Sequence, residues 1–455
     1  MKYFINMYKF SANKYTLPAI LLLALILRLI TAISAISDGE RLLRPDSPGY
    51  LTPARTLVES GTYAGTRRPP GYPLLAAAVY YCGGSNGAIA ILQVLLSTAA
   101  CAVTAMAVRE YTDNTACGNI AALLMAVNPT AVANAPLLLS DTLFMLFAAG
   151  QFYFFIRYLK RMKFRELAIF SVIAALAALI RPINQLIPLV AAVLIAVNDR
   201  MIWKKRITHI LASCAIFAVL IFPWMLRNYL TGATFDIDTN TGAMRHQNGA
   251  MLLAEINNSD FESEKQQLLA QENTLAADGR FPDERSRESW RKQEFRRMVL
   301  AHPVRYFKQH FDICILLPDA PTLLENFGVT TSDRGTMGVL KKDGIIAACR
   351  HYFGENYLRM LLLLIPVLLP AAILYLLVLR QLFKDLQHPV KNRMELLLFL
   401  AFAEYYLFLP GAITAPRYQL PALPCLCLLG ASAISSLWKN ETSARDPETT
   451  PSIEM

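Results

Sequence analysis

Charged residues are scarce in this chain. They make up 17% of its 455 residues, whereas a soluble domain of this size carries roughly 25%. Hydrophobic residues make up 55%, and they are gathered into long runs instead of being spread along the chain. A run of about 20 apolar residues is long enough to cross a hydrocarbon core roughly 30 Å thick. The composition therefore excludes an ordinary soluble protein and indicates an integral membrane protein.

Metal-binding and disulfide patterns are also lacking. The eight cysteines include no CxxC pair and no spacing with histidine that is typical of a metal site. Most of them lie inside apolar runs, where cysteine acts as a small hydrophobic residue. We therefore predict no cofactor and no metal-binding residues, although dependence on a divalent metal stays open.

The apolar runs predict the fold. Those of spanning or nearly spanning length are Leu17–Ile36, Ala88–Val108, Ala116–Asn134, Leu139–Leu159, Leu167–Ile180, Leu186–Val197, Ile207–Trp224, Tyr357–Leu379, Leu396–Leu409 and Leu420–Leu437. Gly71–Cys82 has only about 12 residues and follows two prolines, so we expect a juxtamembrane or half-inserted helix there. The predicted fold is an all-α polytopic membrane protein with about ten transmembrane helices, juxtamembrane helices in the first outer loop and a hydrophilic outer insert.

The net charge of +10 would suggest a nucleic-acid partner in a soluble protein. Here the basic residues gather in short loops between apolar runs, for example around Lys163 and Lys204, as they do on the cytoplasmic side of membrane proteins. We therefore predict no nucleic-acid partner. We expect a multi-pass protein of the cell (inner or plasma) membrane, embedded in the lipid bilayer with both termini in the cytoplasm.

This topology divides the chain into four parts. Residues 1–226 form an N-terminal transmembrane catalytic module whose first outer loop covers residues 37–85, and residues 227–356 form a hydrophilic insert on the non-cytoplasmic side. Residues 357–437 form the C-terminal transmembrane helices, and residues 438–455 a disordered cytoplasmic tail. An insert of that length is usually functional or separately folded.

Ionisable residues collect at the outer ends of the predicted helices. They are Asp46, Arg67, Arg68, Asp141, Arg181, Arg227, Glu404 and Arg417. Charges at membrane depth are costly, so they usually face a cavity and mark a functional site. Arginine is suited to bidentate phosphate contacts, and a carboxylate can take a proton from a hydroxyl. The combination indicates group transfer from a phosphate-linked donor.

Several of these residues also have a purely structural interpretation. Asp46 or Ser47 could cap the helix expected to begin at Pro48, and Asp141 could cap a later one. Arg181, Arg227 and Arg417 could be interfacial anchors that extend to the lipid headgroups. Arg28, deeper in the first run, could pair with Asp46 or Asp141 or extend to the interface.

An ordered set of motifs resembles the GT-C glycosyltransferases. The motifs are Pro45-Asp46-Ser47-Pro48-Gly49-Tyr50, Arg68-Pro69-Pro70-Gly71-Tyr72-Pro73, Leu139-Ser140-Asp141-Thr142-Leu143-Phe144, Ala178-Leu179-Ile180-Arg181-Pro182, Pro223-Trp224-Met225-Leu226-Arg227 and Pro416-Arg417-Tyr418. The set is most similar to the branch related to protein O-mannosyltransferases and lipid A aminoarabinose transferases, and it spans most of residues 17–437.

The resemblance implies a polyprenyl-phosphate sugar donor and a general base at Asp46, with Asp141 as the other catalytic candidate. Family members often carry a second acidic residue directly after the first, where this chain has Ser47. The candidate substrate-binding residues are Tyr50, Arg67, Arg68, Tyr72, Arg181, Arg227 and Arg417. The sugar stays open, and so does the acceptor, which is a glycan, a lipid or a protein.

The predicted reaction is an inverting transfer of the sugar to a hydroxyl acceptor on the non-cytoplasmic face. Asp46 would deprotonate the acceptor, and Arg68, Arg181 and Arg227 would hold the departing phosphate. Two other classes stay open, namely a transporter or flippase of lipid-linked or anionic substrates and a non-catalytic scaffold that displays the insert. Charges gathered at one outer rim favour the enzyme, whereas charges along a central path favour transport.

Overall fold

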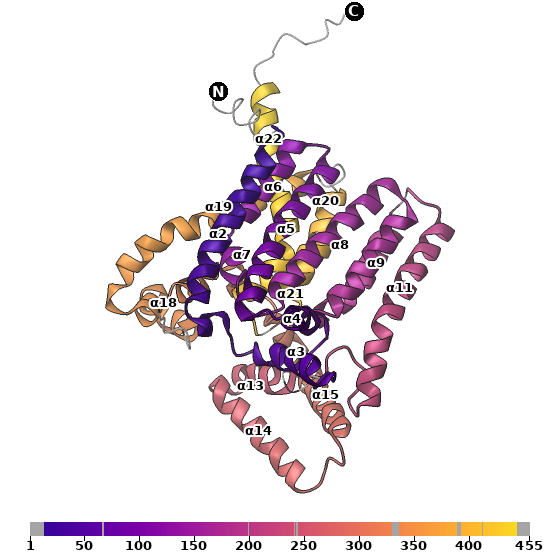
Figure 1. Ribbon diagram of the computed structural model, residues 1–455, viewed down its shortest axis with the longest axis vertical. Coiled ribbons are helices and arrows are strands. Elements are labelled where there is room, and N and C mark those ends of the chain that lie inside the picture. The colour runs from indigo at the N-terminus through magenta and orange to yellow at the C-terminus, as the bar shows by residue number, and fades with distance from the viewer. Residues whose placement is uncertain are drawn as a thin grey trace, which may run out of the picture.

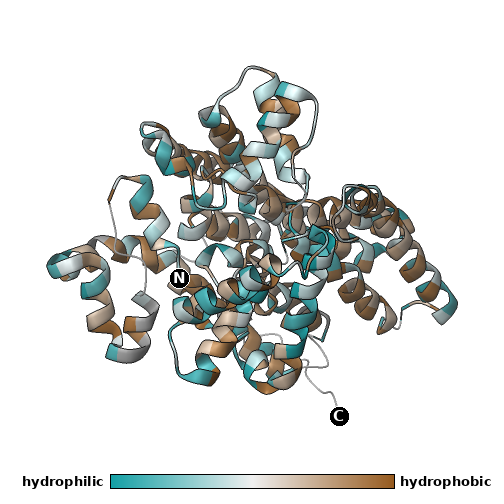
Figure 2. Cartoon of the chain, turned by 90° about the horizontal axis from the view of Figure 1, so that it is seen from below, coloured by the Kyte–Doolittle hydropathy of each residue, from teal (hydrophilic) through white to brown (hydrophobic). Residues whose placement is uncertain are grey.

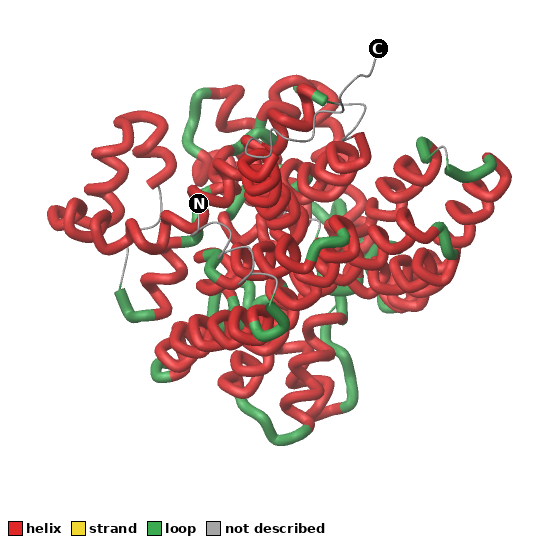
Figure 3. Tube along the Cα trace, turned by 90° about the horizontal axis from the view of Figure 1, so that it is seen from above, coloured by secondary structure: helices red, strands yellow, loops and turns green. Residues whose placement is uncertain are grey.

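The regular structure of the protein is helical. The computed structural model describes residues 13–65, 68–198, 200–240, 242, 244–329, 336–388, 393–411 and 413–443. Within these ranges helices are joined by short loops and no strand occurs (Figure 3). The predicted all-α polytopic fold is therefore confirmed.

Six helical segments among the described residues are long and apolar enough to cross a membrane. They are α2 (Thr16–Ile36), α5 (Asn86–Thr112), α8 (Asp141–Arg161), α11 (Trp203–Leu230), the part of α19 (Tyr357–Gln387) from Leu364 to Gln387, and Pro416–Leu437, which joins the 3-10 helix η7 (Pro416–Ala422) to α22 (Leu423–Ser443). Three shorter apolar helices cover Thr115–Ala126, Pro182–Ala196 and Leu396–Phe408. The remaining predicted run forms α9 (Phe164–Ala178), so every predicted run contains a helix.

The long helices form a bundle with two distinct ends. α2, α5, α6 (Thr115–Ala126) and α8 lie together, with α9 and α11 at one side of them (Figure 1). The start of α2 and the end of α22 lie at one end of the bundle, and the helices of the insert lie at the other (Figure 1). α22 continues to Ser443, and the rest of the predicted tail lies outside the described residues.

The first outer loop forms two short helices at the insert end. α3 (Pro48–Ser60) has a proline at its start and ends at Gly61, whose φ of 67° is the left-handed conformation common after a helix. α4 (Gly71–Tyr81) packs against α3 and has only 11 residues, too few to cross a membrane. The short helix predicted within Gly71–Cys82 is therefore present.

The hydrophilic insert packs on the same end of the bundle. Its first elements are the π-helical turn η3 (Met244–Gly249), α13 (Ala250–Asn257), α14 (Phe261–Ala277) and α15 (Glu284–Ala301). Seen from this end, hydrophilic residues alternate with apolar ones, in contrast to the mostly apolar helices behind them (Figure 2). Further along, Asp319 Oδ2 accepts a 2.8 Å hydrogen bond from Asn134 Nδ2, and Glu325 pairs with Arg44 at 2.8 Å. These contacts fix the insert to the helix ends.

Arg28 is wholly buried inside the bundle and contacts neither of the carboxylates predicted as its partners. Its guanidinium donates to Ser97 Oγ at 2.7 Å and to the carbonyl oxygens of Ala126 at 3.0 Å and Met125 at 3.2 Å. Both predictions, an ion pair and extension to the interface, are therefore wrong. Neutral acceptors on two neighbouring helices satisfy this arginine, so it fastens α2 to α5 and α6.

Candidate active site

The candidate site lies at the insert end of the bundle, where several helices begin. Asp46 lies just before α3, and Asp141 is the first residue of α8. Arg181 directly precedes the 3-10 helix η2 (Pro182–Leu186), and Arg417 lies at the start of η7. A proline at the start of α3, η2 and η7 fixes the backbone there. The sequence thus sets the points from which these charged side chains extend.

The two aspartates and three of the predicted arginines form one linked cluster. Arg417 lies between the carboxylates, with its Nη2 3.0 Å from Asp46 Oδ2 and its Nε 3.9 Å from Asp141 Oδ2. Arg68 Nη2 is 2.7 Å from the other oxygen of Asp46, and Arg181 pairs with Asp141. The structure therefore joins four distant segments through ion pairs in the order Arg68, Asp46, Arg417, Asp141, Arg181.

The two carboxylates differ in their access to solvent. The side chain of Asp46 is 40% exposed, whereas that of Asp141 is 6% exposed. Neither α3 nor α8 has a side-chain hydrogen bond at its N-cap, so capping explains neither aspartate. Ser47 Oγ instead accepts a hydrogen bond from the backbone N–H of Arg44 at 2.9 Å. Asp46 is therefore the carboxylate that an incoming hydroxyl can reach.

Both predicted tyrosines lie against the cluster. The hydroxyl oxygen of Tyr50 accepts hydrogen bonds from Ser140 Oγ at 3.1 Å and Arg68 Nη1 at 3.3 Å. The ring of Tyr72 packs edge-on against that of Tyr50, with centroids 5.3 Å apart. The Tyr72 hydroxyl is buried and has no hydrogen-bond partner among the described residues. A buried hydroxyl without a partner is costly, so it offers a binding point for a ligand atom.

Gly71 allows the first outer loop to approach the end of α9 closely. Its backbone N–H donates to Leu179 O at 2.8 Å. A Cβ atom at position 71 would lie 2.8 Å from that oxygen and 2.7 Å from Ile180 Cγ1, too close for any other residue. The contact brings α4 next to the residue that precedes Arg181.

Arg227 lies on the other side of the first outer loop. Its guanidinium donates to the carbonyl oxygens of Gly65 at 2.9 Å and Tyr63 at 2.7 Å, and it lies 5.0 Å from the Trp224 ring. No ion pair among the described residues joins it to either carboxylate. The structure therefore places Arg227 as a support of the loop, apart from the linked cluster. Arg67 lies outside the described residues.

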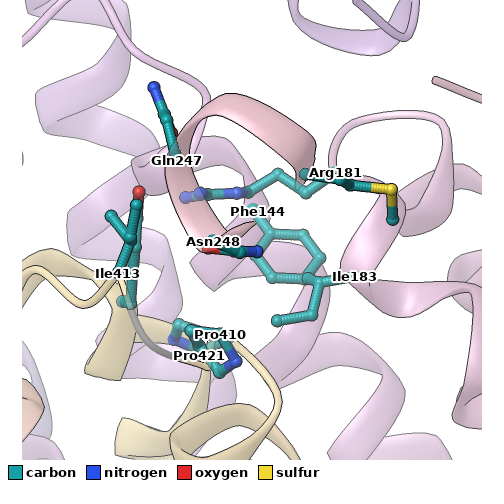
Figure 4. Close-up of a pocket in the computed structure, with 10 residues that line it drawn as sticks. Phe144, Arg181, Ile183, Gln247, Asn248, Pro410, Ile413 and Pro421 are labelled. Carbon is teal, nitrogen blue, oxygen red and sulfur yellow. The ribbon is translucent and has the colours of Figure 1, made fainter. Parts of the chain in front are cut away.

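A cavity of about 220 Å³ opens beside Arg181 (Figure 4). Its polar lining consists of Arg181, Tyr418 and two amide side chains from the insert, Gln247 and Asn248. The guanidinium of Arg181 lies 5.1 Å from the centre of the Tyr418 ring. The remaining lining is apolar and consists of Phe144, Ile183, Met244, Pro410, Ile413 and Pro421. One end of the cavity is thus cationic and its walls are neutral.

Part of the chain matches a known protein family. Residues 67–226 match the dolichyl-phosphate-mannose-protein mannosyltransferase family. The predicted resemblance to the GT-C glycosyltransferases is confirmed by this match, which contains Arg68, Asp141 and Arg181 but excludes Asp46 and Arg417.

Two solved structures are similar to this chain at low identity. The crystal structure of ArnT from Cupriavidus metallidurans bound to undecaprenyl phosphate is 13% identical, with a TM-score of 0.46, and the similarity covers 91% of this chain and 59% of that one. Archaeal oligosaccharyltransferase AglB from Archaeoglobus fulgidus, in complex with an inhibitory peptide and a dolichol-phosphate, is 12% identical, with a TM-score of 0.45, and the coverage is 93% and 51%. This chain spans little more than half the length of either. Among curated proteins, no sequence matches it significantly.

Asp238 is a third carboxylate near the site, and the sequence analysis missed it. It lies in the loop after α11, where its Oδ1 accepts a hydrogen bond from the backbone N–H of Asn240 at 2.7 Å. Burial raises the pKa of Asp238 to about 6, an effect that this hydrogen bond and the charge of Arg68 oppose. Nothing in this turn-rich hydrophilic segment distinguishes Asp238 from its neighbour Asp236.

Proposed function

We propose that the chain is a membrane glycosyltransferase that moves a sugar from a polyprenyl phosphate to a hydroxyl acceptor, with inversion at the anomeric carbon. The proposal is carried by the linked cluster around Asp46, Arg417 and Asp141, which lies beside the cavity at Arg181. The matched family, named for dolichyl-phosphate-mannose, supports a donor of this class.

In the proposed reaction Asp46 is the general base. Its exposed carboxylate takes the proton of the acceptor hydroxyl while the hydroxyl oxygen bonds to the anomeric carbon. The bond from that carbon to the phosphate oxygen breaks, and its electron pair leaves with the lipid phosphate. A phosphate is stable as an anion, so the leaving group needs no general acid. A single displacement inverts the anomeric carbon, unlike the double displacement of retaining glycosidases.

The arginines stabilise the departing phosphate in this proposal. Three guanidinium groups face two carboxylates in the linked cluster, which leaves one positive charge in excess. Arg417 Nε is buried and donates no hydrogen bond to any described residue, and Arg181 lines the cavity. Both therefore have donors for a phosphate, and charge-assisted hydrogen bonds of this kind stabilise a developing anion strongly.

The distribution of charge favours an enzyme over a transporter. The linked cluster lies at one end of the bundle, and Arg28, which is buried inside the bundle, binds neutral groups.

The proposed site faces the non-cytoplasmic side of the membrane, and reporter fusions test this topology. A fusion after Lys163 or Lys204 should report the cytoplasm, and one within Ser259–Asp283 should report the outside. A Lys163 fusion found outside would contradict the topology.

The direct test is consumption of a labelled donor. Purified protein in lipid vesicles is incubated with radiolabelled polyprenyl-phosphate sugars and a panel of glycan, lipid and protein acceptors. We expect release of polyprenyl phosphate and a product whose anomeric configuration, read by NMR, is opposite to that of the donor. The Asp46→Asn/Asp141→Asn double variant gives the background rate. Equal donor loss in the wild type and the double variant, across the panel, would exclude the proposed function.

A further inference from the structure

The hydrophilic insert contributes two side chains to the cavity at Arg181. Gln247 and Asn248 lie in the π-helical turn η3 and line the cavity opposite residues of the bundle. In Figure 4 the Asn248 amide lies in the middle of the side chains that line the cavity, beside the Phe144 ring. Gln247 lies at the edge of the same set of side chains. Neither amide has a hydrogen-bond partner within the described structure. Each therefore keeps both a donor and an acceptor for a ligand.

The turn that carries these amides is anchored from behind. Arg245 is fully buried, where it donates to Leu268 O at 2.7 Å and lies 4.3 Å from the centre of the Trp290 ring. His246 Nε2 is 2.8 Å from Glu272 Oε2 on α14. The two residues before Gln247 are thus tied to α14 and α15. Such anchoring holds a binding group in position before the ligand arrives.

The chemistry of the lining restricts what the cavity can hold. Among the described residues that line it, Arg181 is the only charged one, and none is a carboxylate. A protonated amino sugar would therefore meet the Arg181 guanidinium and no carboxylate in the lining, which is unfavourable at short range. An anionic sugar would compete with the lipid phosphate for Arg181, which already pairs with Asp141. Amide groups instead pair well with neutral hydroxyls, as both donors and acceptors.

We infer that Asn248 and Gln247 bind the hydroxyl groups of the donor sugar and that the cavity selects a single uncharged sugar unit. The cavity volume of about 220 Å³ lies below the roughly 300–1,000 Å³ of sites for drug-sized ligands, which agrees with one sugar ring. The inference rests on the proposed function, and it gives the insert a role in donor selectivity.

The test compares three donors that differ in charge. All three carry the same anionic phosphodiester, but the sugar is neutral in polyprenyl-phosphate mannose, cationic in polyprenyl-phosphate 4-amino-4-deoxyarabinose and anionic in polyprenyl-phosphate glucuronic acid. We expect the wild type to use mannose with the highest kcat/KM. Asn248→Ala should raise the KM for mannose by about threefold to tenfold, the usual worth of one hydrogen bond, with little change in kcat. Asn248→Asp places a carboxylate in the cavity and should shift the preference toward the amino sugar.

Gln266→Ala is the matched control. Gln266 is an exposed amide residue on α14 of the insert, and its Nε2 donates a 2.9 Å hydrogen bond to Glu262 Oε1. It should leave KM and donor preference unchanged. An active wild type whose KM and preference are the same in both Asn248 variants would overturn the inference and leave the proposed function standing. A wild type that uses none of the donors would overturn both.

Discussion

Two clusters of carboxylates and arginines in this molecule differ in how completely their charges are matched and covered. In the insert, the side chain of Glu272 is 1% exposed. Its partners are Arg245, His246, Arg287 and Arg291. At the candidate site, Asp46 is 40% exposed and pairs with Arg68 and Arg417 alone among the described residues. One carboxylate is enclosed, and the other is open to solvent.

The difference separates a structural role from a chemical one. Burial raises the pKa of Glu272, but hydrogen bonds from His246 and Arg291 outweigh it, so the pKa lies well below its usual range. Such a carboxylate stays ionised and keeps its partners in place. At the site, by contrast, a buried nitrogen of Arg417 lacks a hydrogen bond among the described residues, and Asp46 can be reached from outside. Residues of the same type therefore support the fold where they are enclosed and can act on substrate where they are open.

The largest effect on stability is expected from Glu272→Gln. The substitution keeps the shape but leaves the fully buried Arg245 without its ion-pair partner, and breaking a buried ion pair costs about 3–5 kcal/mol. Thermal unfolding followed by tryptophan fluorescence should show the loss. Glu262→Gln is the control, because Glu262 is 54% exposed and pairs with Lys265 at 3.0 Å. A Glu272→Gln protein as stable as this control would remove the distinction between the two clusters.

Removal of Arg181 should weaken donor use next most strongly. A hydrogen bond to a charged group contributes about 1.5–3 kcal/mol, so Arg181→Ala should raise the donor KM by about tenfold to a hundredfold. Arg181→Lys should restore only part of the affinity, because lysine lacks the planar fork.

Arg227→Ala is the informative comparison for the phosphate site. It removes the contacts to Gly65 O and Tyr63 O, so we expect a smaller rise in donor KM and a less ordered first outer loop, measured by hydrogen exchange. An equal rise in Arg227→Ala and Arg181→Ala would instead assign Arg227 to the phosphate, as the sequence predicts.

The smallest effect concerns Asp238 and depends on pH. Its pKa is raised from 3.8 in the ordinary carboxyl to about 6, so the folded protein binds a proton that the unfolded chain releases between these values. Its contribution to stability is therefore complete below about pH 4 and is lost as the pH rises to about 6. Asp238→Asn should match the wild type at pH 4 and exceed it by about 1 kcal/mol at pH 7, allowing for solvent screening. Identical pH profiles of the unfolding midpoint would contradict this.

Much of the fold could be predicted from the sequence because hydropathy and helix signals are local. The apolar runs locate every predicted helix, and the Pro69-Pro70-Gly71 segment with its short apolar stretch predicts α4. Pro48 likewise predicts the start of α3. These features depend on a few neighbouring residues, so they can be recognised without knowing which distant segments come into contact.

The site could be predicted in its residue types but not in its connections. Arg417 and Asp46 are separated by 371 positions, and nothing local in the sequence indicates which carboxylate each arginine meets. Arg28 was misassigned because neutral carbonyl acceptors carry no signal in a side-chain pattern. Asn248 was missed because it lies in a hydrophilic insert, and only packing against the bundle brings its amide to the cavity.

Turnover of Asp46→Asn tests the central claim most directly. Asparagine keeps the size of the side chain but cannot accept the proton, so turnover should fall by roughly 10²–10⁴-fold while donor binding and the unfolding midpoint stay near wild type. Asp38→Asn, in the same loop and paired with Arg41 at 3.2 Å, should turn over donor normally. Wild-type turnover in Asp46→Asn would contradict the account, and an inactive Asp141→Asn beside it would transfer the role of base to Asp141.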